Sequence, residues 1–293
     1  MLRACFPRLI VDSSSISELD RVSWAEGVTI LAYGVRFGIR ANRRGIIEQY
    51  LKALPPSWRL AGSPKVERMY SIIAGGEGRG RRPSHVVYAD GECIARVPRF
   101  EQAADSFESN VQLYVAEMSP RRVFVHAGVV GWRGQAIVIP GRSFSGKTTL
   151  TAALVKAGCV YYSDEYAVLD PLGRVRPYAR LLGIRERGRL ERATRYHVEA
   201  LGGRRGAKPL PVAMVIVSHY KPGGRWRPRR LSAGEGALAM LQNTVSARRE
   251  PQAALSTLRP ALAQSAIFKG VRGEARQVVE FIFAILDKEP QSS

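Results

Sequence analysis

Patterns of apolar residues predict an α+β arrangement in the first part of the chain. Residues 26–41 alternate between apolar and polar positions around a glycine turn, and residues 84–97 do so around an Asp-Gly pair, so both segments are typical of β-hairpins. Helices are predicted over residues 43–54, which end at two prolines, and over residues 101–118, where apolar residues recur every three or four positions. We therefore expect a small α+β region over residues 1–118.

The rest of the chain, residues 119–293, is predicted to be an α/β domain. It opens with strands over residues 122–130 and 135–139, separated by a turn that begins and ends with glycine. A helix over residues 148–157 and a short buried strand over residues 159–162 follow. A strand that leads through a loop into a helix is the usual setting of a phosphate-binding loop.

The pattern toward the C-terminus is less regular. Residues 178–203 are rich in arginine, and residues 202–211 are expected to form a mobile loop. A strand is predicted over residues 212–219, a helix that opens with a Ser-Ala-Gly-Glu capping box over residues 232–247, and an amphipathic helix over residues 273–288. Helices and strands thus continue to alternate to the end of the domain.

The glycine-rich loop before the helix at residues 148–157 carries the clearest chemical motif. Its sequence, PGRSFSGKTTL, fits the pattern G-x-x-x-x-G-K-[ST], in which backbone N–H groups curl around a phosphate. Lys147 is expected to reach the outer phosphates, and the Thr148 hydroxyl is expected to be a ligand of a phosphate-bound Mg²⁺. The residues expected to bind the nucleotide are Gly141, Arg142, Ser143, Phe144, Ser145, Gly146, Lys147, Thr148 and Thr149.

Two acids, Asp164 and Glu165, follow the next predicted strand. Beside a phosphate loop, one carboxylate can hold Mg²⁺ and another can take the proton from an attacking hydroxyl. The candidate metal ligands are therefore Thr148, Asp164 and Glu165, and it stays open which acid is the base. His126 lies in an apolar strand, and by itself this pattern favours a core histidine over a catalytic one.

Charge is the one unusual feature of the composition, with a formal net charge of +20 at pH 7. Residues 1–110 hold 16 Lys and Arg against 12 Asp and Glu, so most of the excess lies in the part with the phosphate loop. Two explanations are equally open, an anionic ligand or partner and a general excess of arginine. Arg185 or Arg187 could contact a γ-phosphate, although a solvated face explains such a segment more simply.

Apolar runs and cysteines exclude several classes of protein. The longest apolar runs are too short to span a membrane, and the N-terminus lacks the apolar region of a signal peptide. We therefore expect a cytoplasmic protein without membrane insertion. The three cysteines, Cys5, Cys93 and Cys159, lack the spacing of a zinc site or a disulfide framework.

Three segments taken together, FVHAGVV, PGRSFSGKTTL and YYSDEYAVLD, resemble the catalytic core of the HPr kinase/phosphorylase family and, more closely, its bacterial HPr-kinase-like relatives. The likeness covers about residues 122–170 and extends loosely to the C-terminus. It implies a phosphoenolpyruvate-carboxykinase-like fold, in which the phosphate loop belongs to a mixed sheet, and an oligomeric assembly. It also implies that Lys147 and Thr148 contact phosphate and Mg²⁺, that Asp164 is the first acid of the family's pair, and that His126 is the family's histidine.

The sequence thus predicts an HPr-kinase-like enzyme that uses ATP and Mg²⁺ to phosphorylate a hydroxyl group. The acceptor expected is a Ser or Thr side chain of a peptide or protein, and the basic charge favours an acidic one. In the expected mechanism, Lys147 and the loop neutralise the phosphates while Asp164 with His126 orients and deprotonates the acceptor. The catalytic residues expected are Asp164, His126, Lys147 and Glu165.

Two other functions stay open. Phe144 stands where the family usually has glycine, and Glu165 stands where it has a second aspartate, which would suit a nucleotide-binding regulatory protein without catalysis. Residues 221–230, KPGGRWRPRR, are basic and include Trp226, which could stack on a base of RNA or DNA. A kinase or binder that acts on nucleic acid is the second alternative.

Overall fold

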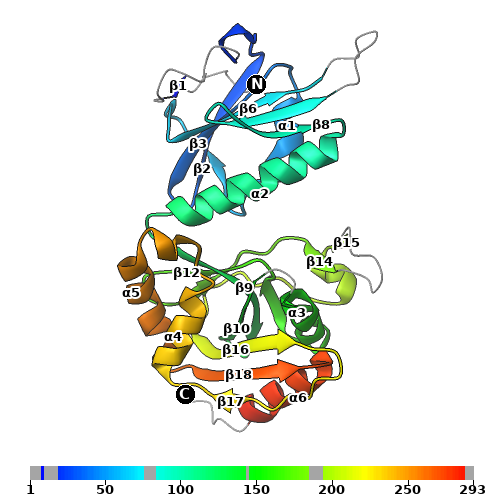
Figure 1. Ribbon diagram of the computed structural model, residues 1–293, viewed down its shortest axis with the longest axis vertical. Helices are drawn as coiled ribbons and strands as arrows, with labels where there is room; N and C mark the ends of the chain where they lie inside the picture. The colour runs from blue at the N-terminus through cyan, green and yellow to red at the C-terminus, as the bar shows by residue number, and fades with distance from the viewer. Residues whose placement is uncertain (1–7, 10–18, 76–83, 143–144, 185–193, 288–293) are drawn as a thin grey trace. The chain divides into compact units, whose positions relative to one another are not determined.

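The computed structural model divides the chain into two compact units, residues 1–121 and 122–293 (Figure 1). Each unit has its own sheet and helices, and the protein is mixed α/β with both parallel and antiparallel strand pairs. The boundary expected after residue 118 falls three residues before this division. The structure describes residues 8–9, 19–75, 84–142, 145–184 and 194–287.

The first unit is built on one sheet. Its strands are β1 Arg8–Leu9, β2 Glu26–Ala32, β3 Val35–Ala41, β4 Arg59–Leu60, β5 Lys65–Val66, β6 Arg68–Ile73, β7 His85–Ala89 and β8 Glu92–Val97. Among the described residues, six of these strands form a sheet in the order β4-β2-β3-β6-β7-β8, and β1 pairs with β5. β3 and β6 are parallel, while the other neighbours in the sheet are antiparallel.

The predicted hairpins at residues 26–41 and 84–97 are confirmed. Both turns place two successive residues in the left-handed region, with φ of 51° at Asp90 and 89° at Gly91 in the second hairpin. Such turns match the twist of the strands they join, and Asp and Gly tolerate them well. The Asp90 carboxylate also accepts hydrogen bonds from Met69 N at 2.8 Å and Arg68 Nε at 2.9 Å, which fastens the hairpin to β6.

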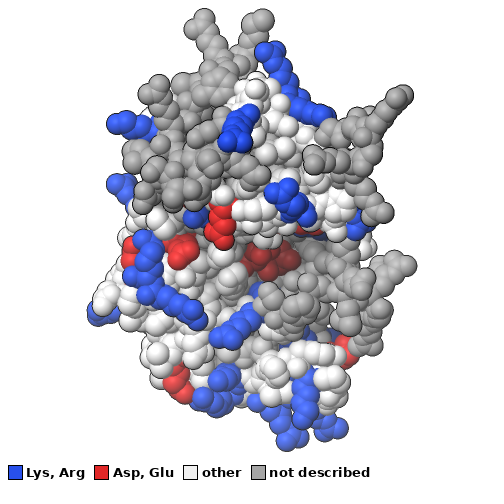
Figure 2. All heavy atoms as spheres, turned by 45° about the horizontal axis from the view of Figure 1, so that its top comes forward, with Lys and Arg blue, Asp and Glu red and all other residues white. Residues whose placement is uncertain are grey.

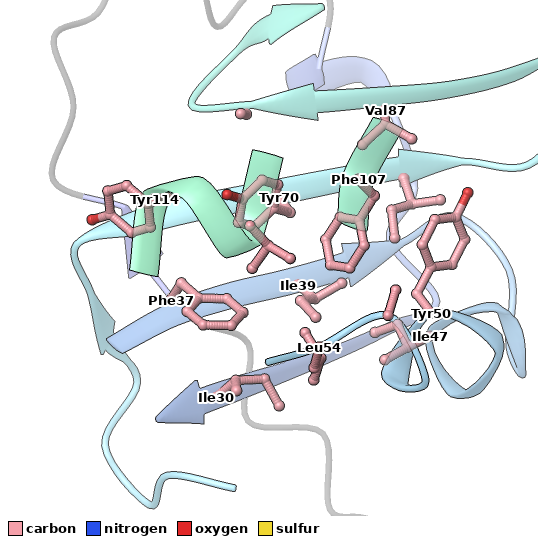
Figure 3. Close-up of a cluster of buried hydrophobic side chains, with 14 of the residues drawn as sticks. Ile30, Phe37, Ile39, Ile47, Tyr50, Leu54, Tyr70, Val87, Phe107 and Tyr114 are labelled. Atoms are coloured by element: carbon pink, nitrogen blue, oxygen red, sulfur yellow. The ribbon is translucent and has the colours of Figure 1, made fainter. Parts of the chain in front are cut away.

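The helix predicted over residues 101–118 is confirmed as α2 (Phe100–Met118), which packs on the sheet. Its apolar face carries Phe107, whose ring meets Tyr50 and Tyr70 edge-on at centroid distances of 5.2 and 5.0 Å (Figure 3). These rings are fully buried. Edge-on aromatic contacts add to the free energy gained from burial, so this cluster is the main apolar anchor of the first unit.

The helix predicted over residues 43–54 is shorter in the structure, where α1 covers Ile46–Leu51. Its start is fixed by Glu26, whose carboxylate accepts hydrogen bonds from Gly45 N at 3.0 Å and Ile47 N at 2.7 Å. A carboxylate satisfies otherwise unpaired N–H groups and is favoured by the helix dipole there. A side chain from β2, remote in sequence, therefore determines where α1 begins.

Replacement of Phe107 by Ala tests the packing of the first unit. Phe107→Ala leaves a cavity between Tyr50 and Tyr70, so we expect the free energy of unfolding to fall by about 3–5 kcal/mol. Phe107→Leu keeps most of the volume and should cost less than about 1.5 kcal/mol. Urea denaturation of both variants measures the difference, and a cost below about 1 kcal/mol for the alanine variant would contradict the packing described.

The second unit is built on a larger, mixed sheet. Its strands are β9 Val123–Trp132, β10 Gln135–Pro140, β11 Val160–Ser163, β12 Tyr166–Leu169, β13 Val175–Arg176, β14 Leu182–Ile184, β15 Thr194–Tyr196, β16 Val212–Tyr220, β17 Arg229–Arg230 and β18 Ala266–Arg272. In the described part of this unit, the sheet has eight strands: seven follow the order β13-β12-β9-β10-β16-β18-β17, and β11 pairs with β9. β14 and β15 pair only with each other in the described residues. β10, β16 and β18 are mutually parallel, and the other pairs are antiparallel.

Helices cover both faces of this sheet (Figure 1). Helices α3 (Lys147–Lys156) and α6 (Ala275–Leu286) pack on one face, against side chains such as Ile137 and Met214. Helices α4 (Ala233–Leu241) and α5 (Pro251–Leu262) pack on the other face, against Val138 and Val215. Successive strand residues point to opposite faces, so the apolar runs of β10 and β16 contribute side chains to the cores on both faces of the sheet.

Several predicted elements of this unit need correction. β9 continues past residue 130 to Trp132, and Arg133 and Gly134, with φ of 47° and 79°, form a two-residue turn. The helix expected over residues 232–247 has the predicted capping box but ends at Leu241, followed by a 3₁₀ turn over Val245–Arg248. Asn243 and Thr244 donate side-chain hydrogen bonds to the carbonyls of Ala239 and Met240, which competes with further helix there.

The segment expected to be a mobile loop, residues 202–211, is irregular but hydrogen-bonded to the sheet. Gly206 N donates to Tyr161 O at 2.8 Å, and Leu210 N donates to Val175 O at 2.9 Å. Strands β12 and β18 and helix α5 are absent from the sequence-based predictions. The predicted strand at residues 212–219 and C-terminal helix at residues 273–288 are confirmed as β16 and α6.

Among the residues that the structure describes, no helix combines the length and apolar character that crossing a membrane requires.

Candidate functional site

The glycine-rich loop joins β10 to α3, as the sequence predicts. Gly146 precedes the helix with φ of 83°, a conformation that favours glycine. Lys147 folds back over the loop, and its Nζ donates to the carbonyl of Arg142 at 2.9 Å. Ser145 Oγ is buried without a hydrogen-bond partner among the described residues. Ser143 and Phe144 lie outside the described residues, while Arg142 and Thr149 are exposed beside the loop.

Helix α3 is held against β9 by a close contact between Thr151 and Gly128. A β-carbon at Gly128 would collide with the Thr151 hydroxyl on α3. Thr151 is fully buried, and its hydroxyl has no hydrogen-bond partner among the described residues. The glycine of the His-Ala-Gly segment is therefore needed so that the helix after the loop can approach the strand.

The two acids and the loop flank the same point of β9. On one side of β9, Ala127 pairs with Pro140, the last residue before the loop. On the other side, Ala127 N donates to the carbonyl of Glu165 at 3.1 Å. Since neighbouring strands lie about 4.8 Å apart, the start of the loop and the backbone of the acids are separated by about 10 Å. The register of three strands thus brings together two motifs that are 16 residues apart in the sequence, from Thr148 to Asp164.

Ser163 shapes the turn that presents the acids. Its hydroxyl accepts hydrogen bonds from Glu165 N at 3.1 Å and Tyr166 N at 3.0 Å, between β11 and β12. A serine that bonds to N–H groups two and three residues later stabilises a tight turn. The turn leaves the Asp164 and Glu165 side chains at the edge of the sheet nearest to the loop.

Asp164 is the most connected side chain of the site. Its carboxylate accepts hydrogen bonds from Tyr161 OH at 2.8 Å, from Thr148 Oγ1 at 3.4 Å and from Gly183 N at 3.4 Å. These donors come from β11, from the first turn of α3 and from β14. The predicted metal ligands Thr148 and Asp164 therefore lie in contact.

Electrostatic effects join Lys147 and the two acids into one cluster. Burial raises the pKa of Asp164, although its hydrogen bonds act in the opposite direction. Burial and the neighbouring Asp164 raise the pKa of Glu165, while Lys147 and Arg195 oppose this shift. The pKa of Lys147 is lowered by burial, with both acids partly offsetting the change. Adjacent carboxylates destabilise each other when both are ionised, and a divalent cation would relieve this repulsion.

The chemistry of this donor set fits Mg²⁺. The side chains that lie together are two carboxylates and one hydroxyl, which are the hard oxygen ligands that Mg²⁺ prefers alongside phosphate oxygens. Among the described residues, no group of three or more His, Cys, Asp or Glu side chains is assembled as a metal site. The protein would therefore supply few ligands, as is usual for Mg²⁺ held together with a nucleotide.

His126 connects β9 to the loop through its backbone and lies beside Tyr166 through its ring. Its carbonyl accepts a hydrogen bond from Gly141 N at 3.0 Å, and its ring centroid is 4.8 Å from that of Tyr166. Burial and the nearby Lys147 charge lower the pKa of the imidazole. The neutral form is favoured, which allows one ring nitrogen to accept a proton.

Four residues near the site are not singled out by the sequence motifs. Gly183 donates to Asp164, Arg195 acts on Glu165, and Arg272 donates to the loop carbonyl of Gly146 with Tyr220 beside it. They come from β14, β15, β18 and β16, and only strand pairing brings them near the loop. Arg185 and Arg187, the arginines that could contact a γ-phosphate, lie outside the described residues.

The basic segment at residues 221–230 includes Trp226, the residue on which the nucleic-acid alternative depends. The Trp226 ring packs edge-on against Phe281 of α6 at 5.8 Å, and its Nε1 is buried. Gly270 of β18 is needed for this packing, since a β-carbon there would lie 2.9 Å from the indole. The ring is therefore half-buried at the border of the core, with part of its surface held against α6.

The described Lys and Arg side chains on one face of the protein are dispersed (Figure 2). On the face drawn in Figure 2, the described Lys and Arg side chains form separate groups and no single continuous stripe. Nucleic acid binding is typically carried by a contiguous basic patch. The net charge is large, but its arrangement on this face is not that of a surface that binds a polyanion such as nucleic acid.

No protein-family model matches this sequence, and no curated protein matches it.

Gly128 offers a direct test of the contact between α3 and β9. Gly128→Ala should lower the free energy of unfolding by about 1–3 kcal/mol, because the new methyl group collides with the Thr151 hydroxyl. Thr151→Ala removes that hydroxyl, so the double variant should recover most of the loss. Urea denaturation of the two single variants and the double variant gives the coupling energy. Strictly additive effects would show that the contact is not as described.

Asp164→Asn tests the electrostatic cost of the site. Because the pKa of Asp164 is raised above its ordinary 3.8, the folded state is disfavoured as the carboxyl ionises with rising pH. We expect Asp164→Asn to be more stable than wild type by about 1 kcal/mol at pH 7–8, without ligand. The difference should narrow steadily as unfolding is measured down to pH 4. A difference that widens as the pH falls would contradict the raised pKa.

Proposed function

We propose that the second unit binds ATP with Mg²⁺ and transfers the γ-phosphoryl group to a hydroxyl, that of a Ser or Thr side chain in a peptide or protein. The observation that carries the proposal is the contact between Thr148 and Asp164, which joins the helix after the phosphate loop to the paired acids. A glycine-rich loop alone binds phosphate. A carboxylate in contact with its Ser or Thr residue adds the second element that phosphoryl transfer requires.

The order of strands supports a phosphoenolpyruvate-carboxykinase-like core. The strand before the loop, β10, has an antiparallel neighbour, β9, on one side and a parallel neighbour, β16, on the other. In the common P-loop proteins this strand lies in a parallel sheet. The mixed arrangement favours the likeness to HPr-kinase-like proteins, in which a His-x-Gly strand, a loop and paired acids occur together.

The residues of the site divide the work of transfer. The N–H groups of the loop and Lys147 hold the β- and γ-phosphates, while Thr148 and Asp164 hold the cation. Mg²⁺, when bound, neutralises charge on the phosphates. Lys147 donates to a carbonyl of its own loop, so its ammonium already lies over the loop. Positioning and electrostatic stabilisation supply most of the rate enhancement in this class of reaction.

Glu165 is the better candidate for the base. Asp164 has three donors at its carboxylate, whereas the Glu165 carboxylate makes no hydrogen bond within the described chain. Its pKa is raised, which makes it a stronger proton acceptor than an ordinary glutamate. Neutral His126, on the neighbouring strand, orients the acceptor hydroxyl. In this assignment, Asp164 is a ligand of the metal and Glu165 accepts the proton of the acceptor hydroxyl.

A comparison of lysines tests the proposal. Lys147→Ala removes the phosphate contact, whereas Lys156→Ala removes an exposed lysine from the last turn of the same helix. We expect Lys147→Ala and Asp164→Ala to lower transfer at least about 100-fold, and Lys156→Ala to leave it unchanged. Transfer of labelled phosphate from ATP to a degenerate Ser/Thr peptide library in the presence of Mg²⁺ measures the rate.

The outcomes separate the proposed functions. Tight binding of ATP by the wild type without transfer to any peptide or protein would favour a regulatory nucleotide-binding protein. Absence of ATP binding by the wild type would overturn the proposal altogether. Equal transfer by wild type and Lys147→Ala would show that the loop does not take part in the reaction.

A further inference from the structure

A buried arginine lies directly behind the phosphate loop. Arg272 is the last residue of β18 and is only 1% exposed. β10, β16 and β18 are parallel, so their carboxyl ends point to the same edge of the sheet, which is where open α/β sheets bind ligands. The loop leaves the end of β10. The register of the sheet therefore carries Arg272 to the loop from a position about 125 residues further along the chain.

The guanidinium group is attached to the loop through backbone carbonyls. Nη2 donates to Gly146 O at 2.8 Å, and Nη1 donates to Gly273 O at 2.9 Å. The guanidinium carbon lies 5.4 Å from the ring centroid of Tyr220. A side chain at position 146 would collide with Nη2, so the guanidinium occupies the space beside the last glycine of the motif.

The charge of Arg272 is poorly compensated. Among the described residues, no carboxylate forms an ion pair with it, and its Nε is buried without a hydrogen-bond partner. Burial accordingly lowers the pKa of Arg272, and the opposite effects of Tyr220 and Glu274 do not cancel this shift. A buried cation is costly unless an anion lies near it. Packing alone therefore does not explain why the Arg272 guanidinium is buried here.

Gly146 is the residue through which this charge can act on a ligand. Its carbonyl accepts both the Arg272 hydrogen bond and that of Leu150 N at 3.2 Å. The first N–H groups of an α-helix have no partner within the helix, and they are the groups that bind anions at helix N-termini. Fixing the Gly146 carbonyl fixes the peptide planes that carry the first of these N–H groups.

We propose that Arg272 is the positioning residue of the phosphate loop. It acts through the Gly146 carbonyl, and its poorly compensated charge is balanced further when an anion occupies the loop. The inference rests on the proposed function in one respect, because it requires that the loop binds the phosphates of a nucleotide. It adds that affinity for a phosphate chain depends on a side chain outside the motif, at the end of another strand.

Two variants of Arg272 and one matched control test the proposal. Arg272→Gln keeps a donor but removes the charge, and Arg272→Lys keeps the charge but loses the two-pronged bridge between the carbonyls. Arg276→Met removes the same charge from an exposed position on α6, where the side chain is 87% exposed. Calorimetric titration with inorganic pyrophosphate, without metal, measures the dissociation constant, and ligand-free thermal unfolding is recorded for each variant.

We expect Arg272→Gln to weaken pyrophosphate binding at least about tenfold and Arg272→Lys to weaken it less, about threefold or more. Arg276→Met should bind as the wild type does. Where transfer is measurable, KM for ATP should rise by the same factor while kcat changes less than about threefold, as for a residue that acts on binding alone. The ligand-free melting temperature of Arg272→Gln should not fall, since a buried charge has been removed.

Each outcome decides the inference. Wild-type affinity in Arg272→Gln would overturn it, as would a loss of affinity that appears only together with a lower ligand-free melting temperature. If Arg272→Gln does not fold, wild-type affinity in Arg272→Lys alone overturns the proposal. Failure of the wild type itself to bind pyrophosphate or ATP would instead show that the proposed function is wrong.

Discussion

The hydrogen bond between Thr148 and Asp164 joins the two halves of the candidate site, and the proposed chemistry of the second unit depends on it. It joins two segments that are separate in the sequence, the helix after the glycine-rich loop and the turn between β11 and β12. Each is held from behind by β9, through Gly128 on one side and through Ala127 N and the carbonyl of Glu165 on the other. The site is therefore a consequence of strand register, and a slip of one residue in β9 would separate its parts.

This arrangement is costly for the ligand-free protein. Two adjacent carboxylates with raised pKa values, a lysine with a lowered pKa and a buried arginine all lie close to one loop. Charges of this kind destabilise a fold unless something compensates them. The two large apolar cores on either face of the sheet supply the stability that the site does not. Strained electrostatics in one place and ample burial elsewhere are typical of functional sites.

Much of this could be predicted from local sequence, and the remainder depends on long-range pairing. The hairpin at Asp90-Gly91, helix α2, the loop and the acids follow from turn chemistry, periodicity and motif spacing, and these appear in the structure at the predicted places. β12 and β18 escape prediction because four to seven residues with an unclear period resemble a loop as much as a strand. With β18 unpredicted, Arg272 had no reason to be placed near Gly146. The packing of Trp226 could not be predicted for the same reason, since its neighbour Phe281 lies on a remote helix.

The central claim is that loop and carboxylates hold a phosphate chain and a cation together, and the metal dependence of nucleotide binding tests it most directly. Titration of the wild-type protein with a non-hydrolysable ATP analogue, once with Mg²⁺ and once with a chelator, gives two dissociation constants. The account predicts binding at least about tenfold tighter with Mg²⁺, since Thr148 and Asp164 then share a ligand with the phosphates. Equal affinity in the two titrations, or no binding in either, would contradict it.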